Sequence, residues 1–200
     1  IDNDLQSYGE ILMQCKRGSI VAIEPKTGEI LALVSAPSYD PNLLVGRKRS
    51  QNYTMLYNDS IAKPLFDRAL LAEYPPGSTF KPFTALLGLQ EGVMTPSSLV
   101  SCNGGYRYGN RIMKCHGHAS PIDMIHALAT SCNAYFAHEY RKIIEKYPTP
   151  TQGLTAWAED LKSFGFGAYL GSDFPIGRKG YLPDAAFYDR QYGVDGWRAT

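Results

Sequence analysis

The segment YPPGSTFKPFTALLGLQEG, residues 74–92, contains the strongest structural pattern in the sequence. Its PPGS portion interrupts regular structure, and apolar residues then recur at helical spacing from Phe80 to Leu89. This pattern predicts a helix that begins at once and carries Ser78 and Lys81 in its first turn. Because residues three apart share one face of a helix, the two side chains lie together, beside N–H groups that favour developing negative charge.

Upstream of this segment, three patterns predict a helix, a β-hairpin and a loop. A capping acid precedes apolar residues at helical spacing, two β-rich stretches flank a turn with Pro and Gly, and a region rich in Pro, Asn and Ser follows. The expected elements are, in chain order, a helix from Asp4 to about Lys16, strands at 19–23 and 30–34 around a turn at 25–28, and an irregular surface loop at 36–59.

Downstream of the segment, the sequence predicts mainly helices. Ser120, Pro121 and Asp123 have the residue types of an N-cap, a first and a third helical position, so a helix is expected to begin there. The breaker PTP separates two later helical patterns. The expected elements are a helix from Ser120 to the TSCNAYF stretch, helices at about 134–147 and at 154–164, and a loop over the last 35 residues.

Composition and charge restrict the class of protein. Lys and Arg number 20 and Asp and Glu number 19, so the formal net charge is +1, which disfavours a binder of nucleic acid or other polyanions. Hydrophobic residues make up 44% and charged residues 20%, which is the balance of a packed globular domain. The 200 residues are enough for one domain or a large part of one.

The two ends of the sequence indicate a piece of a longer protein. The chain opens at Ile1 without an initiator Met and ends in WRAT, residues 197–200, without a closing element. It contains no run of about 18 apolar residues and no signal peptide. A membrane anchor, if the protein has one, is therefore expected outside these residues.

Ser78 and Lys81 form a Ser-x-x-Lys pair, which alone is common and usually means a capping hydroxyl and a solvated amine. Two further features change this interpretation. A PPG turn precedes Ser78, and the triplet Ser131-Cys132-Asn133 follows 53 residues downstream at a helix junction. Together these motifs resemble the penicillin-recognising serine acyltransferases.

The resemblance covers nearly the whole chain and is closer than superfamily level, to the elongation-type class B penicillin-binding proteins, the penicillin-binding protein 2 group. It implies an α+β transpeptidase fold of the penicillin-binding protein and serine β-lactamase type, with an antiparallel sheet and helices. Residues 1–200 would be the N-terminal part of this domain, without its C-terminal strands. The stretches that carry the resemblance are GSIVAIEPKTGEILALVSAPSYDPN (18–42), YPPGSTFKPFTAL (74–86), ALATSCNAYF (127–136) and GRKGYLP (177–183).

The same resemblance implies roles for four residues, and no cofactor for catalysis. The four are Ser78 as the acylated nucleophile, Lys81 as the general base, Ser131 as a proton relay and Asn133 as a ligand of the substrate amide. The chemistry agrees, because a Ser hydroxyl needs a base, and a Lys serves near neutral pH only where burial or nearby cations lower its pKa. The backbone N–H of Ser78 would supply one half of an oxyanion hole.

The third motif of the family, Lys-Thr/Ser-Gly on a strand downstream of Ser-x-Asn, is not found where it is expected. The KTG at 26–28 precedes Ser78, and Gly with a nearby Pro fits a hairpin turn there. Tyr108-Gly109-Asn110 is likewise interpreted as a turn. The third motif is therefore expected beyond residue 200, so that the domain is truncated before it.

Three cysteines and a histidine form a second candidate site, with the spacing C-x12-C-x2-H-x13-C. Three thiols and an imidazole suit a tetrahedral, structural Zn²⁺ that would hold the connector between the two catalytic helices. Some relatives of the resembled group carry a metal near the active site. His116 competes as the imidazole ligand, and a Cys102–Cys115 disulfide or unrelated buried thiols are alternatives to a metal. The candidate ligands are Cys102, Cys115, His118 and Cys132.

The resemblance also implies a function and its setting. It indicates a peptidoglycan D,D-transpeptidase, with related carboxypeptidase chemistry, that crosslinks stem peptides ending in D-Ala-D-Ala and is a target of β-lactams. The implied location is the periplasm, on a protein anchored in the inner membrane. Implied partners are a SEDS-type glycosyltransferase and other elongation-machinery proteins, and nucleic acid is not expected.

Two other functions fit the same motifs. A serine β-lactamase or a β-lactam sensor would use this scaffold, but the sequence has no E-x-x-L-N element to supply a deacylating carboxylate. An inactive scaffold fragment, stabilised by zinc, is the second alternative. Acylation by a labelled penicillin separates the enzymes from the scaffold, and the rate of deacylation separates a transpeptidase from a β-lactamase.

Overall fold

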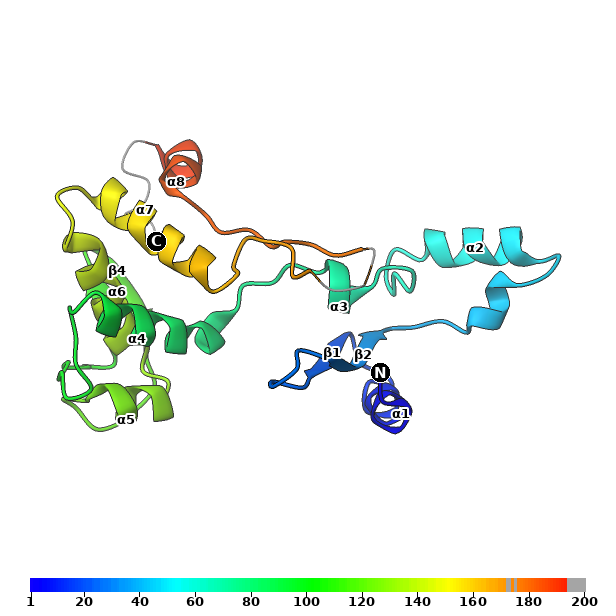
Figure 1. Ribbon diagram of the computed structural model, residues 1–200, viewed down its shortest axis with the longest axis horizontal. Coiled ribbons are helices and arrows are strands. Elements are labelled where there is room, and N and C mark those ends of the chain that lie inside the picture. Colours follow the sequence, from blue (N-terminus) through cyan, green and yellow to red (C-terminus); the bar gives the residue numbers. More distant parts are fainter. Residues whose placement is uncertain (172–173, 175, 194–200) are drawn as a thin grey trace. The chain divides into compact units, whose positions relative to one another are not determined.

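The computed structural model describes residues 1–171, 174 and 176–193, and the other positions, the terminal WRAT among them, lie outside the described residues. The chain divides into two compact units, Ile1–Glu73 with Gly171–Arg178, and Tyr74–Leu170 with the residues from Lys179 onward (Figure 1). Each unit combines helices with an antiparallel pair of strands, as expected for the α+β class. No helix in the described ranges is long and apolar enough to cross a membrane.

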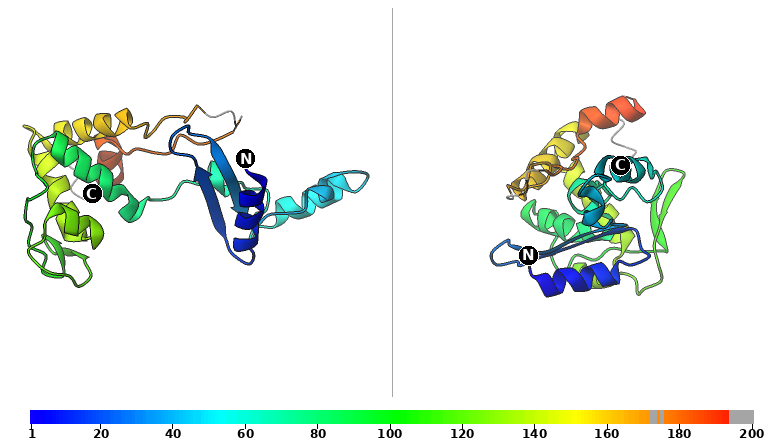
Figure 2. Two further views of the ribbon diagram at one scale, coloured as in Figure 1. Left: turned by 60° about the horizontal axis from the view of Figure 1, so that its bottom comes forward. Right: turned by 90° about the vertical axis from the view of Figure 1, so that its right-hand side faces the viewer.

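The first unit contains the predicted hairpin, covered by one helix (Figure 2). The buried side of the second strand includes Val34, and the helix approaches it closely at Gly9, where a Cβ would lie 2.9 Å from Val34 Cγ2. Any side chain at position 9 would therefore separate the helix from the strand. The elements are α1 (Asn3–Leu12), β1 (Gly18–Ile23) and β2 (Ile30–Ala36).

The turn of this hairpin contains the KTG sequence. Glu24 Oε2 accepts hydrogen bonds of 2.7 Å from the backbone N–H groups of Lys26 and Thr27. Gly28 has a φ of +79°, a conformation that favours glycine. The KTG sequence therefore lies in a hairpin turn, as the sequence predicted.

The predicted boundaries of the first helix are wrong at both ends. The N-cap is Asp2, not Asp4, because its backbone N–H is held by Leu31 O at 2.7 Å and its side chain accepts from Leu5 N at 2.9 Å. The helix ends at Leu12 rather than near residue 16, and Cys15 has a φ of 59°. A tertiary contact with β2 thus sets the start of α1.

The predicted loop at 36–59 contains two helical segments, so that prediction is wrong in part. Asp40 caps the first segment by accepting from Asn42 N at 2.9 Å, and Asn52 Nδ2 of the second donates to Leu43 O at 2.7 Å. The second segment lacks an apolar stripe, which explains why the sequence did not reveal it. The helices of this part of the chain are η1 (Pro41–Leu44, 3₁₀), α2 (Arg49–Asn58) and α3 (Arg68–Leu71).

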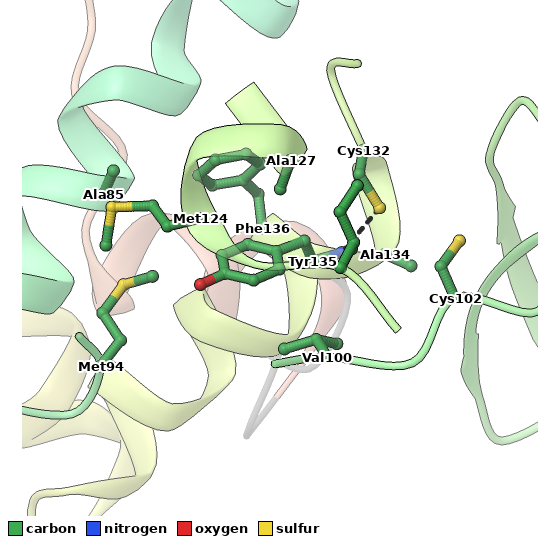
Figure 3. Packing of buried hydrophobic residues seen from close by; sticks show 11 residues of the cluster. Ala85, Met94, Val100, Cys102, Met124, Ala127, Cys132, Ala134, Tyr135 and Phe136 are labelled. Atoms are coloured by element: carbon green, nitrogen blue, oxygen red, sulfur yellow. Dashed lines mark hydrogen bonds between the residues drawn. The ribbon is translucent and has the colours of Figure 1, made fainter. Parts of the chain in front are cut away.

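The second unit packs its helices around two clusters of buried side chains. Tyr135 is fully buried in the first cluster, which Figure 3 shows together with the cysteines at its edge. Leu87, Leu161 and Trp157 belong to the second cluster. The elements are η2 (Gly77–Phe80, 3₁₀), α4 (Lys81–Gln90), β3 (Gly105–Tyr108), β4 (Arg111–Lys114), α5 (Met124–Ala129), α6 (Asn133–Glu145), α7 (Pro150–Ser163) and α8 (Ala185–Tyr192).

Side-chain caps explain where the predicted helices of this unit differ from the observed ones. Helix α5 starts after Asp123, whose carboxylate accepts from His126 N at 2.9 Å, whereas Ser120 Oγ accepts from Cys102 N at 2.9 Å instead. The PTP stretch separates α6 from α7, as predicted, but α7 begins at Pro150 rather than at residue 154, because Thr149 and Gln152 form a capping box. Helix α8 lies in the region expected to be loop.

The Tyr108-Gly109-Asn110 stretch is a turn, as predicted, but the two strands that it joins were not predicted. Strands β3 and β4 pair in register from Gly105 with Lys114 to Tyr108 with Arg111. Gly109 has a φ of 54°, as two-residue hairpin turns require.

Two neighbouring leucines of α4 test the second buried cluster. Leu87 is completely buried, so we expect Leu87→Ala to lower the free energy of unfolding by about 2–5 kcal/mol, since it leaves a cavity. Leu86 is 49% exposed on the same helix, and Leu86→Ala should cost less than about 1 kcal/mol. Urea denaturation of both variants measures the difference, and equal losses would contradict this placement of α4.

Candidate functional site

Lys81 lies at the centre of the candidate catalytic site. Its Nζ donates to Ser131 O at 2.6 Å, to Ser131 Oγ at 2.8 Å and to Asn133 Oδ1 at 2.7 Å. A protonated lysine has three N–H groups, so these three acceptors use its full donor capacity. The structure therefore brings together three of the four residues proposed from the sequence, across about 50 residues of chain.

A helix junction positions Ser131 and Asn133. Ser131 N donates to Leu128 O at 3.1 Å, and Cys132 N donates to Ala127 O at 2.9 Å, the two bonds of a Schellman motif at the end of α5. Cys132 Sγ then accepts from Tyr135 N at 3.3 Å and caps α6 (Figure 3). Helix α5 thus ends just before the Ser-x-Asn triplet, and α6 begins at its Asn133.

Ser131 occupies the position of that motif where glycine is usual. Its φ is 54°, a left-handed conformation that costs a non-glycine residue about 1–2 kcal/mol. Backbone strain of this kind is typical of functional sites, where the surrounding structure maintains it. Here the strained residue offers both its carbonyl and its hydroxyl to Lys81.

Ser78 lies in the 3₁₀ turn η2, just before α4, rather than in the first turn of an α-helix as predicted. The turn follows Gly77, whose φ of +61° favours glycine. The Ser78 side chain is exposed, and within the described part of the chain its hydroxyl makes no hydrogen bond. Ser78 therefore lies three residues before Lys81, and no hydrogen bond joins their side chains in the described part of the chain.

Burial affects the proton affinity of Lys81. Removal from water lowers the pKa of Lys81, and negative charge on Cys115 and Cys132 opposes this shift. The ring of the buried Phe136 lies 5.9 Å from Nζ and contributes to that environment. A lowered pKa is the property that a general base needs near neutral pH.

Asn133 is held at both ends of its side-chain amide. Its Oδ1 accepts from Lys81, and its Nδ2 donates to Lys114 O at 3.0 Å. The Asn133 backbone N–H donates to Cys115 Sγ at 3.3 Å. The contribution of Lys114 was not predicted, because a backbone carbonyl has no sequence signature. The hairpin at 105–114, had it been predicted, would indicate where this carbonyl lies.

The candidate metal ligands form one cluster behind the Ser-x-Asn triplet. Ligand atoms of Cys102, Cys115, His118 and Cys132 all lie within 4.8 Å of one another. Cys115 Sγ lies 3.6 Å from His118 Nε2 and 3.9 Å from Cys132 Sγ. Ligand atoms around a tetrahedral zinc with Zn–S bonds of about 2.3 Å are about 3.8 Å apart, so the cluster fits this ion.

The surroundings of the thiols also suit a cation. Burial opposes ionisation of Cys115, but the Asn133 N–H, the His118 ring and the Ala134 N–H outweigh it and lower the pKa of Cys115 to about 6. Burial raises the pKa of Cys132 to about 11, so its ionisation needs a compensating positive charge. All four cysteines of the chain are free, and the alternative Cys102–Cys115 disulfide is not formed.

The two histidines of the CHGH stretch differ in orientation. His118 points Nε2 at the thiols, and its Nδ1 donates to Ala119 O at 2.7 Å, an interaction typical of metal-binding histidines. His116 Nε2 instead contacts Thr130 O. The geometry therefore selects His118 over His116 for the cluster.

Comparison with known families identifies the chain. The model of the penicillin binding protein transpeptidase domain matches residues 18–200. The chain belongs to this transpeptidase family. The peptidoglycan D,D-transpeptidase MrdA of Acinetobacter baumannii is 37% identical over 190 residues, which cover 92% of this chain but 26% of that protein. The chain therefore spans about a quarter of the length of this transpeptidase relative.

Solved structures of transpeptidase family members share the fold. Pseudomonas aeruginosa PBP2 in complex with WCK 5153 is 36% identical with a TM-score of 0.78, covering 95% of this chain and 42% of that chain. The imipenem acyl-enzyme complex of penicillin-binding protein A from M. tuberculosis is 31% identical with a TM-score of 0.69. The match covers 84% of this chain and 40% of that chain. The complex between PBP2 and MreC from Helicobacter pylori is 26% identical with a TM-score of 0.79. The match covers 94% of this chain and 34% of that chain. The expected transpeptidase fold, present in part, is confirmed.

Proposed function

We propose that this chain is the N-terminal part of the catalytic domain of a peptidoglycan D,D-transpeptidase of the penicillin-binding protein 2 group. The observation that carries the proposal is the contact of Lys81 with Ser131 and Asn133. Lys81 lies three residues after Ser78, which is exposed. Residues 1–200 are then one partial transpeptidase domain that contains both compact units. The third catalytic motif lies in a later part of the full protein.

The proposed reaction has two acyl-transfer steps. Ser78 Oγ bonds to the penultimate D-Ala carbonyl carbon while its proton passes to Lys81, and the amide C–N bond then breaks. The leaving D-Ala amine takes a proton delivered through Ser131. In the second step, an amine of another stem peptide bonds to the ester carbonyl carbon, the C–O bond to Ser78 breaks, and the proton of the amine returns to Ser78 Oγ; water in place of the amine gives carboxypeptidase activity. A β-lactam ring opens by the first step alone and leaves Ser78 acylated.

The proposal assigns a specific task to each polar group around Ser78. Lys81 accepts the hydroxyl proton once it is neutral, and Ser131 Oγ, 2.8 Å from Nζ, is placed to relay a proton. Asn133 orients the substrate amide. The backbone N–H of Ser78 stabilises the oxyanion, an effect typically worth about 3 kcal/mol in the transition state.

We also propose a cellular setting by analogy with the relatives. The full protein is anchored in the inner membrane and carries this domain in the periplasm. The H. pylori PBP2 structure contains MreC, so an elongation-machinery protein of that kind is a proposed partner. A SEDS-type glycosyltransferase is the proposed source of the glycan strands that carry the stem peptides.

Zinc is the proposed occupant of the Cys102, Cys115, His118 and Cys132 cluster. The fit of the ligand distances and the lowered pKa of Cys115 support this assignment. A bound zinc would crosslink the 102–118 connector to the start of α6 and would take no part in the acyl transfer. The chain's own contribution is the N–H donors of Asn133 and Tyr135, which orient the two sulfurs.

Acylation by a penicillin tests the proposed nucleophile. We expect intact-protein mass spectrometry of the full protein to show one penicilloyl adduct, because acylation is the step that a β-lactam shares with the substrate. Ser78→Ala should abolish the adduct, and Ser7→Ala, at an exposed serine of α1, should retain it. Lys81→Met should slow acylation by about 100-fold or more, because it removes the base. An adduct on Ser78→Ala would refute the assignment.

The pH dependence of acylation tests the role of Lys81. A general base acts in its neutral form, so the acylation rate should rise with pH and level off above the pKa of Lys81. Burial lowers this pKa, so the plateau should begin below the ordinary lysine value of about 10.4. The measurement is the rate of fluorescent-penicillin labelling from pH 5 to 10. A rate independent of pH would show that Lys81 does not deprotonate Ser78.

Native mass spectrometry tests the proposed metal site. The purified chain should carry the mass of one zinc, which denaturation in acid removes. His118→Ala should reduce zinc affinity by about tenfold or more, since it removes a ligand, whereas His116→Ala should leave it unchanged. A mass two hydrogens lower, retained after denaturation, would instead indicate a disulfide and contradict the proposal.

A further inference from the structure

The β3–β4 hairpin ends at the residue that fixes the orientation of the Asn133 amide. Lys114, the last residue of β4, supplies the carbonyl that accepts from Asn133 Nδ2 at 3.0 Å. With Nδ2 held there, Oδ1 faces Lys81. If the amide turned over, its NH₂ group would face the lysine ammonium, which is also a donor. The position of Lys114 therefore decides which end of Asn133 meets Lys81.

The hairpin needs support from the rest of the unit to hold that position. An isolated two-stranded hairpin is marginally stable in water, and every residue of β4 is exposed. The hairpin packs against α6, and Tyr106 is its partly buried contact with the core. Contacts with α6 are therefore one source of support for Lys114.

Arg141 of α6 contacts two tyrosines of the hairpin. Its guanidinium lies 5.7 Å from the centre of the Tyr108 ring, and the Tyr106 side chain interacts with it electrostatically. Glu145, one turn further along α6, accepts from Arg141 Nε at 2.6 Å and fixes the guanidinium. A planar guanidinium can stack on one ring while it bonds to other groups, which a lysine cannot do equally well.

These contacts connect the start of α6 to its middle through the hairpin. The helix begins with Asn133, and eight residues later Arg141 holds the hairpin whose last carbonyl holds the Asn133 side chain. We propose that Arg141 is a positioning residue for acyl transfer, acting through Tyr106, Tyr108 and the β3–β4 hairpin on the orientation of the Asn133 amide. This role rests on the proposed function, since Asn133 matters only if the site is catalytic.

Side-chain amide exchange tests the inference without any need for activity. In NMR spectra of the ¹⁵N-labelled chain, the Asn133 NH₂ hydrogens should exchange with solvent about three- to tenfold faster in Arg141→Ala than in the unsubstituted chain, as loss of one hydrogen bond predicts. Arg107→Ala, at an exposed cation of β3, is the matched control and should leave the exchange unchanged. If Arg141→Ala does not fold, Tyr106→Phe, which removes one hydroxyl, should raise exchange in the same direction.

Acylation in a double-mutant cycle links this effect to chemistry. Arg141→Ala should slow penicillin acylation by about three- to tenfold, and it should have no further effect in an Asn133→Ala background, because it acts through that residue. Additive effects, or unchanged Asn133 exchange, would overturn the inference. Absence of acylation in the unsubstituted full protein, which includes the third motif, would refute the proposed function instead, and the exchange measurement would still decide whether Arg141 orients Asn133.

Discussion

The donor capacity of one ammonium group organises the candidate site. Lys81 Nζ has three N–H groups, and a single helix junction supplies all three acceptors, one of them a backbone carbonyl. Because the acceptors belong to Ser131 and Asn133, two positions apart in the chain, α4 and the α5–α6 junction cannot shift relative to each other without loss of hydrogen bonds from a half-buried cation. Such a loss is costly in a partly desolvated site.

The polar contacts of this unit form two layers around Cys132. In front, Ser131 and Asn133 face Lys81; behind, the Cys132 sulfur joins the cluster of thiols and imidazole. The same sulfur caps α6, so one small side chain serves the helix and the cluster together. The β-hairpin adds a second support, since Lys114 holds the Asn133 amide and the next residue, Cys115, holds the Asn133 backbone.

Motif residues could be predicted from the sequence better than the contacts that place them. Spacing located the helix after PPGS, the first hairpin and the four cluster residues, because periodicity and turn chemistry are local. The cap of α1 was predicted at Asp4 instead of Asp2, since the choice depends on Leu31, which is distant in sequence. The left-handed conformation of Ser131 and the hydrogen bond to the Lys114 carbonyl were not predicted, because neither is indicated by a residue type in the sequence.

The short connection between α5 and α6, residues 130–132, restricts how this family member can change over evolution. Its middle residue has a left-handed conformation, and the two residues beside it already make capping bonds. An insertion or deletion between Thr130 and Asn133 would rotate one of the two acceptor residues away from Lys81, so sequence length is fixed there. The exposed turn at Gly109 and Asn110 carries no such constraint, and changes in length between relatives should accumulate at that tip.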